Sequence, residues 1–173
     1  MFLALKGFSL IMLYVILVWN KGKYSSDSFL LFYLVILMGH AILPYMFVQF
    51  MENRLTLSRN LPVPLYKIAA AYLIPYVLFL LPELTYILYH AKDFSIENRI
   101  AYYVNLVASL FLLTAVQYSD AFNRNEYMKA SFGLFFVSIF ALHWQAFWVW
   151  IGIQAVIGII LFRTGYYRYE TAP

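Results

Sequence analysis

The sequence predicts an all-α protein, a polytopic bundle of transmembrane helices with no soluble domain. Of its 173 residues, 64% are hydrophobic and only 12% are charged, whereas soluble domains contain about 25% charged residues. The mean hydropathy is +0.75. The few charged residues are confined mostly to short segments between long apolar stretches. This is the pattern of membrane spans joined by polar loops.

Six apolar segments are candidate spans, because a helix needs about 20 mostly apolar residues to cross a bilayer. The first is interrupted only by Lys6, which we expect to extend toward the membrane surface. The second contains Pro44, near which we expect a kink. The third carries Pro75 and Pro82 on nearly one face, so we expect a curved helix rather than a gating hinge. The six segments, all within a single domain 1–173, are 2–19, 29–51, 65–90, 100–119, 130–142 and 146–162.

The last two candidate spans come from one uncharged stretch, Ala130 to Phe162. A single straight helix over this stretch would be about 50 Å long, far more than a hydrocarbon core of roughly 30 Å. Polar residues gather around Trp144, so we expect the helix to break between Leu142 and Gln145. Each half is then short for a full crossing. Five spans, with one tilted, shallow or re-entrant segment, are therefore the alternative.

The distribution of basic residues predicts that both termini face the cytoplasm. With six spans, one side of the membrane collects seven Lys or Arg residues and the other side four, and cytoplasmic loops carry the excess. Membrane lipid is then the surrounding partner. The chain has no run of five like charges, so we expect no nucleic-acid partner. It has no cysteine, which excludes disulfides and thiolate metal sites.

Glu83 is the acidic residue that lies well inside a candidate span. An ionisable group in lipid is expensive and is a functional candidate by default, although a local bend would place Glu83 in the interface or in a wet vestibule. Asn105 is a second polar candidate, in an uncharged span. The three histidines fall in three segments without the spacing of metal ligands, so we expect no metal and no cofactor; they are His40, His90 and His143.

Two groups of small residues allow helices to approach closely. They are Ala69–Ala71 in the third candidate span and Gly152, Ala155 and Gly158 in the last one. They indicate either packing within the subunit or the face of a homodimer or heterodimer.

The segment between the second and third candidate spans has a distinctive order of residues. From Gln49 to Ile74 it reads QFMENRLTLSRNLPVPLYKIAAAYLI: a polar helix-prone stretch, a Pro-containing turn, a lysine and a new apolar stretch. It resembles the cytoplasmic loop of permease subunits of type-2 ABC exporters. Glu52 and Arg54 match the acid–Arg part of that loop, and Lys67 matches its basic residue. Residues 61–63 match the turn, which Pro64 follows in place of the usual small hydroxyl residue.

The resemblance implies a permease subunit of an ATP-driven exporter in a bacterial inner membrane. Such a subunit forms the substrate path and dimerises through its spans. The chain has no Walker-type phosphate loop, so a separate soluble ATP-binding-cassette subunit is expected to hydrolyse ATP. The chain departs from the family in its short N-terminal stretch and in lacking a large extracytoplasmic domain. The coupling residues implied are Glu52, Arg54, Leu57, Arg59, Leu61 and Lys67.

Two other classes of function stay open on the sequence. One is a small integral-membrane enzyme or cofactor-binding protein, in which Glu83 acts as acid or base and a histidine as ligand or base. The other is a non-catalytic subunit that packs around a larger membrane complex.

Overall fold

The computed structural model describes residues 2–19, 21, 26–54, 63–92, 94–119, 123–144 and 146–168, and within these ranges all regular secondary structure is α-helical. This confirms the predicted all-α class. The helices are α1 (Phe2–Trp19), α2 (Ser26–His40), α3 (Ile42–Arg54), α5 (Leu65–Phe79), α6 (Leu81–His90), α7 (Ile96–Val116), α8 (Arg124–His143) and α9 (Phe147–Arg168).

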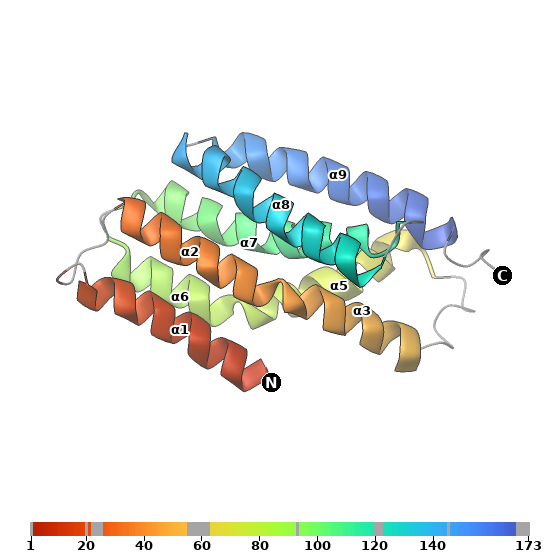
Figure 1. The fold of residues 1–173 in the computed structure, drawn as a ribbon, viewed down its shortest axis with the longest axis horizontal. Helices are drawn as coiled ribbons and strands as arrows, with labels where there is room; N and C mark the ends of the chain where they lie inside the picture. Colours follow the sequence, from red (N-terminus) through yellow and green to blue (C-terminus); the bar gives the residue numbers. More distant parts are fainter. Residues whose placement is uncertain are drawn as a thin grey trace.

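The helices lie side by side along the long axis of the molecule (Figure 1). The chain turns back at the two ends of the bundle in alternation. Helices α3, α7 and α9 finish, and α5 and α8 begin, at the same end of the bundle, which we call the α3–α5 end. Helix α7 is central, because it packs against α3, α5, α6, α8 and α9. Helix α1 packs on α2 and α6 and begins about halfway along the bundle.

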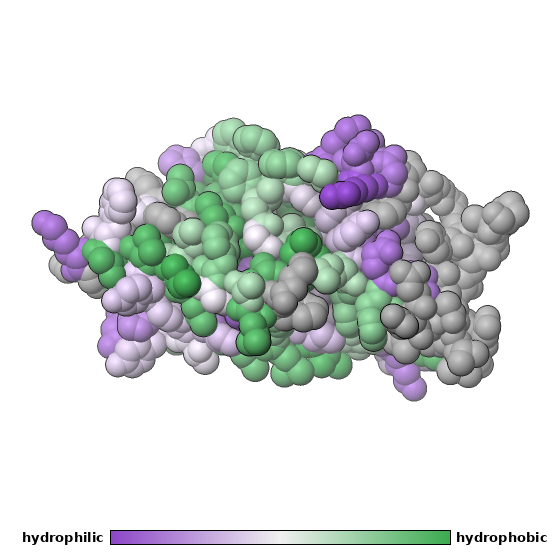
Figure 2. Space-filling model, turned by 60° about the horizontal axis from the view of Figure 1, so that its bottom comes forward, coloured by the Kyte–Doolittle hydropathy of each residue, from purple (hydrophilic) through white to green (hydrophobic). Residues whose placement is uncertain are grey.

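Three helical stretches in the described residues are long and apolar enough to cross a membrane: Ser28–Glu52, Ile96–Val116 and Phe147–Tyr166. The bent pair α5–α6 is a fourth if it counts as one span, and α1 is a shorter apolar helix. Apolar residues form the middle of the face drawn in Figure 2, and hydrophilic residues gather toward both ends. Exposed branched side chains cover much of α9, namely Val149, Ile153, Val156, Ile157, Ile159 and Ile160. An exposed apolar surface this large suits an apolar surrounding.

The second candidate span breaks close to the proline that was predicted to kink it. Helix α2 ends at His40, and α3 begins at Ile42. Pro44 has no N–H to donate to the His40 carbonyl four residues earlier, and its ring crowds that carbonyl. The helix is therefore interrupted at Ala41, although α2 and α3 still count together as one stretch, Ser28–Glu52, and are not among the helix pairs bent by more than 40°.

The third candidate span is bent more sharply than predicted. Helices α5 and α6 meet at Leu80 with an angle of 44° between them, where we expected one curved helix. Pro82 stands in the first turn of α6, where a missing N–H costs nothing within that helix. It leaves the Leu78 carbonyl without its helical partner. Pro75 lies inside α5 and does not end that helix.

The uncharged stretch from 130 to 162 breaks at Trp144, as predicted. The expectation that each half is short for a crossing is wrong for α9, which has 22 residues and is long and apolar enough to cross a membrane. Helix α8 has 20 residues but begins with charged ones, and it is not among the helices that meet this criterion. Helix α8 begins at Arg124 because the Asn123 side chain caps it by accepting a hydrogen bond from the Glu126 backbone N–H at 2.9 Å. Ser95 likewise caps α7, which starts four residues before the predicted span.

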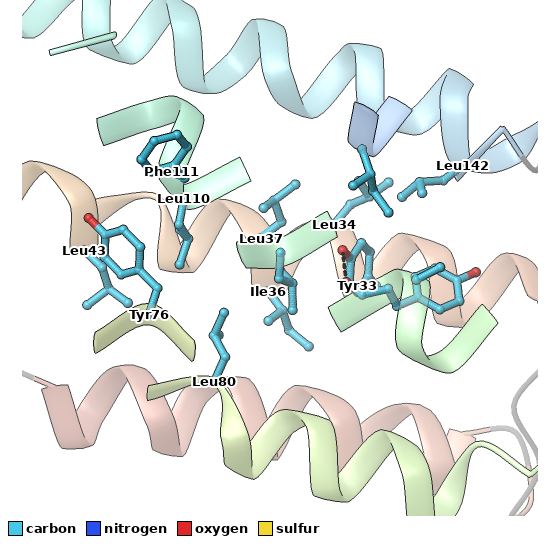
Figure 3. Close-up of a cluster of buried hydrophobic side chains, with 14 of the residues drawn as sticks. Tyr33, Leu34, Ile36, Leu37, Leu43, Tyr76, Leu80, Leu110, Phe111 and Leu142 are labelled. Carbon is cyan, nitrogen blue, oxygen red and sulfur yellow. Dashed lines mark hydrogen bonds between the residues drawn. The ribbon is translucent and has the colours of Figure 1, made fainter. Parts of the chain in front are cut away.

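The interior of the bundle is a continuous apolar cluster built from most of the helices. Figure 3 shows side chains of α2, α3, α5 and α7 turned toward one another, among them Tyr33, Leu34, Ile36, Leu37, Leu43, Tyr76, Leu110 and Phe111. Small residues let α9 pack closely on α7. A Cβ on Gly158 would lie 3.1 Å from the Phe111 ring, so Gly158 serves contact within the chain.

Gly165 should be the least replaceable of these glycines. A Cβ there would lie 2.1 Å from the Tyr118 carbonyl oxygen, which is a backbone atom and cannot move away unless the chain itself shifts. Gly165→Ala is therefore expected to lower the free energy of unfolding by about 1–3 kcal/mol, the usual cost of overpacking. The measurement is the thermal unfolding midpoint in detergent. Gly152→Ala is the control, because no atom lies within 4 Å of its added Cβ. Equal midpoints for the two variants would contradict the packing described for α9.

Candidate functional site

A cluster of charged and polar side chains is buried where the two broken helices meet. Its centre is Glu83, whose side chain is only 1% exposed. Lys6 of α1 donates a hydrogen bond to Glu83 Oε2 and forms an ion pair with it. Ser9, also on α1, donates to Glu83 Oε1 at 2.5 Å. His40 brings its Nε2 to 3.4 Å from the same Oε1. We call these four residues the Glu83 cluster.

The backbone places each charge of this cluster at a favourable helix end. Glu83 lies in the first turn of α6, just after the break at Leu80. His40 lies in the last turn of α2, just before the break at Ala41. The N-terminal end of a helix carries partial positive charge and the C-terminal end partial negative charge. A carboxylate at the start of α6 and an imidazolium at the end of α2 are both stabilised by this arrangement.

Lys6 turns inward, which corrects the prediction that it extends to the membrane surface. Its ammonium group lies 3.9 Å from the centre of the Phe79 ring and is bound to Glu83. An ammonium over an aromatic face gains a cation–π attraction. Burying the Glu83 carboxylate alone would cost several kcal/mol, and the partners on α1 and α2 offset that cost. The cluster therefore joins α1, α2, α5 and α6.

The structure brings one of the three histidines to Glu83. His90 lies against Tyr86 and Tyr89, with ring centres 4.4 and 4.8 Å away, and His143 is exposed at the end of α8. Within the described ranges there is no group of three His, Asp or Glu side chains that could hold a metal ion. Glu83 and His40 form a buried acid–base pair.

Asn105, the second polar candidate, belongs to a different buried group. Its Nδ2 donates to the Tyr33 hydroxyl at 2.9 Å, and that hydroxyl donates to the Tyr102 carbonyl at 2.8 Å. One turn further along α7, Ser109 accepts from Gln154 of α9 at 3.1 Å. These bonds fix α7 against α2 and α9. Asn105 therefore has a packing role through its Nδ2, whereas its Oδ1 is buried without a hydrogen-bond partner among the described residues.

At the α3–α5 end, hydroxyl groups tie three helices together. Tyr118, which follows α7, donates to Glu52 Oε1 of α3 at 3.2 Å. Its oxygen lies 2.5 Å from the hydroxyl of Tyr72 on α5. Glu52 and Lys67 line a cavity of about 140 Å³ together with Tyr72 and Tyr166. Two of the predicted coupling residues, Glu52 and Lys67, thus face the same cavity from the last turn of α3 and the first turn of α5.

The other predicted coupling residues are not placed. Arg54 is the last residue of α3, but its side chain is not among those that the structure describes. Leu57, Arg59 and Leu61 lie outside the described residues. Sequence reasoning also missed two members of the Glu83 cluster: Ser9 entirely, and Lys6 as a partner of Glu83. The one available signal was that Lys6 is the single charge in its apolar segment.

Comparisons with known proteins do not add to this picture. No family model, curated protein or solved structure matches the chain.

The Lys6–Glu83 pair should be essential to the stability of the bundle. Lys6→Met leaves the Glu83 carboxylate buried without its cation, and removing one partner of a buried pair typically costs about 3–5 kcal/mol. Adding Glu83→Gln to this variant should recover part of the loss, because the remaining charge is then gone. Thermal unfolding of the two single variants and the double variant in detergent measures this coupling.

Lys129→Met is the matched control. Lys129 pairs with Glu126 at 2.6 Å, but both side chains are exposed, 72% and 44%, so little change is expected. If Lys6→Met unfolds at the same temperature as Lys129→Met, the buried pair does not hold α1 in place.

Proposed function

We propose that the chain is the membrane-spanning permease subunit of an ATP-driven exporter in a bacterial inner membrane. Its apolar helices cross the bilayer as six spans, of which α1 is the shortest. The α3–α5 end faces the cytoplasm, because the segments at that end hold seven Lys or Arg residues against four at the other. Helix α9 finishes at that end, and the start of α1 points toward it.

One observation carries the coupling part of this proposal. The connection 55–64 is flanked by α3 and α5, and each of these is one half of a broken helix. The breaks, at Ala41 and Leu80, adjoin two members of the Glu83 cluster, His40 and Glu83. A force on the connection would therefore act on α3 and α5, two helices whose breaks at Ala41 and Leu80 lie close together in the interior.

The α3–α5 end has the bonds needed to move as a unit. Tyr118 and Tyr72 link Glu52 to α5 through consecutive hydroxyl contacts, so α3 and α5 are held to each other and to the end of α7. When a soluble ATPase subunit pulls on the connection, the outer halves α3 and α5 rotate about Ala41 and Leu80. Bent helices that pivot at a few residues are a common device for alternating access.

A second permease copy or a related subunit packs against the groove between α5, α7 and α9. This groove has a volume of about 420 Å³ and an almost wholly apolar lining that includes Ala69, Ala70, Ala108 and Ala155. Small side chains let a partner helix approach closely in a bilayer. Three of these alanines belong to the two groups singled out in the sequence.

The contact between His40 and Glu83 favours a second function, a membrane enzyme that uses this pair as acid and base.

The permease and the enzyme differ in the partner proteins that they are expected to bind. We would purify the tagged chain from its own membranes in mild detergent and identify co-purifying proteins by mass spectrometry. A stoichiometric soluble ATPase with a phosphate-binding loop supports the permease. Recovery of the chain alone, or with membrane subunits only, contradicts it and favours the enzyme or a structural subunit of a larger complex.

Leu57→Asp should uncouple ATP hydrolysis from transport. We propose that the leucines of the connection 55–64 dock into a groove of the ATPase subunit, and the substitution places a carboxylate among them. Transport by the complex reconstituted in vesicles should fall at least tenfold, while the amount of protein inserted in the membrane stays the same.

Ser58→Asp is the control, because it adds the same charge to the neighbouring position, which is already polar. Normal transport by Leu57→Asp, or equal losses in both variants, would contradict a docking role for Leu57.

A further inference from the structure

The contact between His40 and Glu83 has an unusual arrangement of hydrogen-bonding groups. His40 Nδ1 lies 2.8 Å from the Ile36 carbonyl oxygen. His40 Nε2 is buried, has no hydrogen-bond partner among the described residues, and lies 3.4 Å from Glu83 Oε1. The imidazole is therefore fixed on one side and faces a carboxylate oxygen on the other.

The Ile36 carbonyl determines which His40 nitrogen carries the proton of a neutral ring. A carbonyl oxygen can only accept a hydrogen bond, so Nδ1 must be the donor, and Nε2 of a neutral imidazole is then an acceptor. An ionised carboxylate is also an acceptor. Without a further proton, two lone pairs would face each other across 3.4 Å in a buried site, where an unpaired polar group is costly.

Among the described residues, the other groups around Glu83 do not supply this proton. Ser9 donates its hydroxyl proton to Oε1, and Lys6 donates to Oε2. Phe79 of α5, which packs on both Lys6 and His40, has no proton to give. Tyr103 of α7 interacts electrostatically with Glu83, but its hydroxyl donates to the Val77 carbonyl at 2.9 Å. The position between Nε2 and Oε1 is thus left with two acceptors.

We propose that the His40–Glu83 pair is a proton-binding site, in which one bound proton bridges His40 Nε2 and Glu83 Oε1 at neutral pH. The proton comes from water and returns to water, so no bond other than this hydrogen bond forms or breaks. The helix ends favour the form in which His40 holds the proton, because α2 ends and α6 begins at the pair. This inference goes beyond transport by an ATP-driven exporter and does not depend on it.

Lys6 provides the entry to the site. Its side chain is 15% exposed, whereas those of Glu83 and His40 are each 1% exposed. A proton therefore reaches the pair past the Lys6 ammonium group. Binding of the proton draws together His40 and Glu83, and so the two helix breaks that adjoin them.

Nitrogen NMR of the histidine rings tests the proposal directly, because protonated and unprotonated imidazole nitrogens have well-separated ¹⁵N shifts. The sample is full-length protein in detergent with ¹⁵N-labelled histidine and the substitutions His90→Gln and His143→Gln, so that His40 is the one histidine left. Both replaced residues lie away from the Glu83 cluster. At pH 7 we expect both His40 nitrogens to carry protons, and Nε2 to lose its proton on titration to higher pH.

Infrared spectroscopy covers the case in which Glu83 holds the proton. A protonated carboxyl group has a C=O stretching band that a carboxylate lacks, and Glu83→Gln identifies this band by removing it. Protonated Nε2, or a Glu83 carboxyl band together with unprotonated Nε2, supports the proposal. Unprotonated Nε2 without such a band at pH 7 overturns it.

Glu83→Gln also serves as the matched variant in the NMR experiment. The new amide can donate to Nε2, so His40 should return to the neutral ring, with the Nε2 signal of an unprotonated nitrogen at pH 7. If this variant does not fold, Ser9→Ala keeps the acid–base pair and should still show the bridging proton. A His40 that stays doubly protonated in folded Glu83→Gln contradicts the role of Glu83 in holding the proton.

Discussion

The buried carboxylate of Glu83 sets the main physical constraint on this bundle. An ionised group in an apolar interior is tolerated only with a counter-charge and hydrogen bonds that replace its water. Those partners come from two helices that are distant in sequence, Lys6 and Ser9 on α1 and His40 on α2. The position of α1 depends strongly on this requirement, because α1 packs on α2 and α6 alone among the larger helix contacts.

The two helix breaks and the Glu83 cluster explain one another. Pro44 and Pro82 each leave a carbonyl of the preceding turn without its helical partner, and helix ends of opposite polarity result at adjacent places in the interior. Charged side chains then occupy the ends that suit them. An unbroken pair of helices would offer neither the polarity nor the local freedom to rotate. The interior therefore combines a continuous apolar cluster with one polar site, the Glu83 cluster, at the two helix breaks.

Local features of the sequence predicted most of the fold. Proline disrupts the helical turn that precedes it, so the break near Pro44 could be predicted. The polar residues beside Trp144 likewise indicated the break between α8 and α9. The early start of α8 is also encoded locally, since Asn123 followed by Glu126 is a capping pattern.

The pairing within the Glu83 cluster could not be predicted in this way. Lys6 and Glu83 are 77 residues apart, and nothing near either residue encodes its partner. Glu83 itself could nonetheless be singled out from the sequence, because an acid among apolar residues needs a compensating group somewhere in the fold.

The same long separation has a consequence for how the protein is made. During synthesis Lys6 leaves the ribosome well before Glu83, and at chain elongation rates of about 5–20 residues per second the delay lasts several seconds. Throughout this interval the first helix has a charge and no counter-charge. It can therefore take its final place against α6 only after α6 has been made.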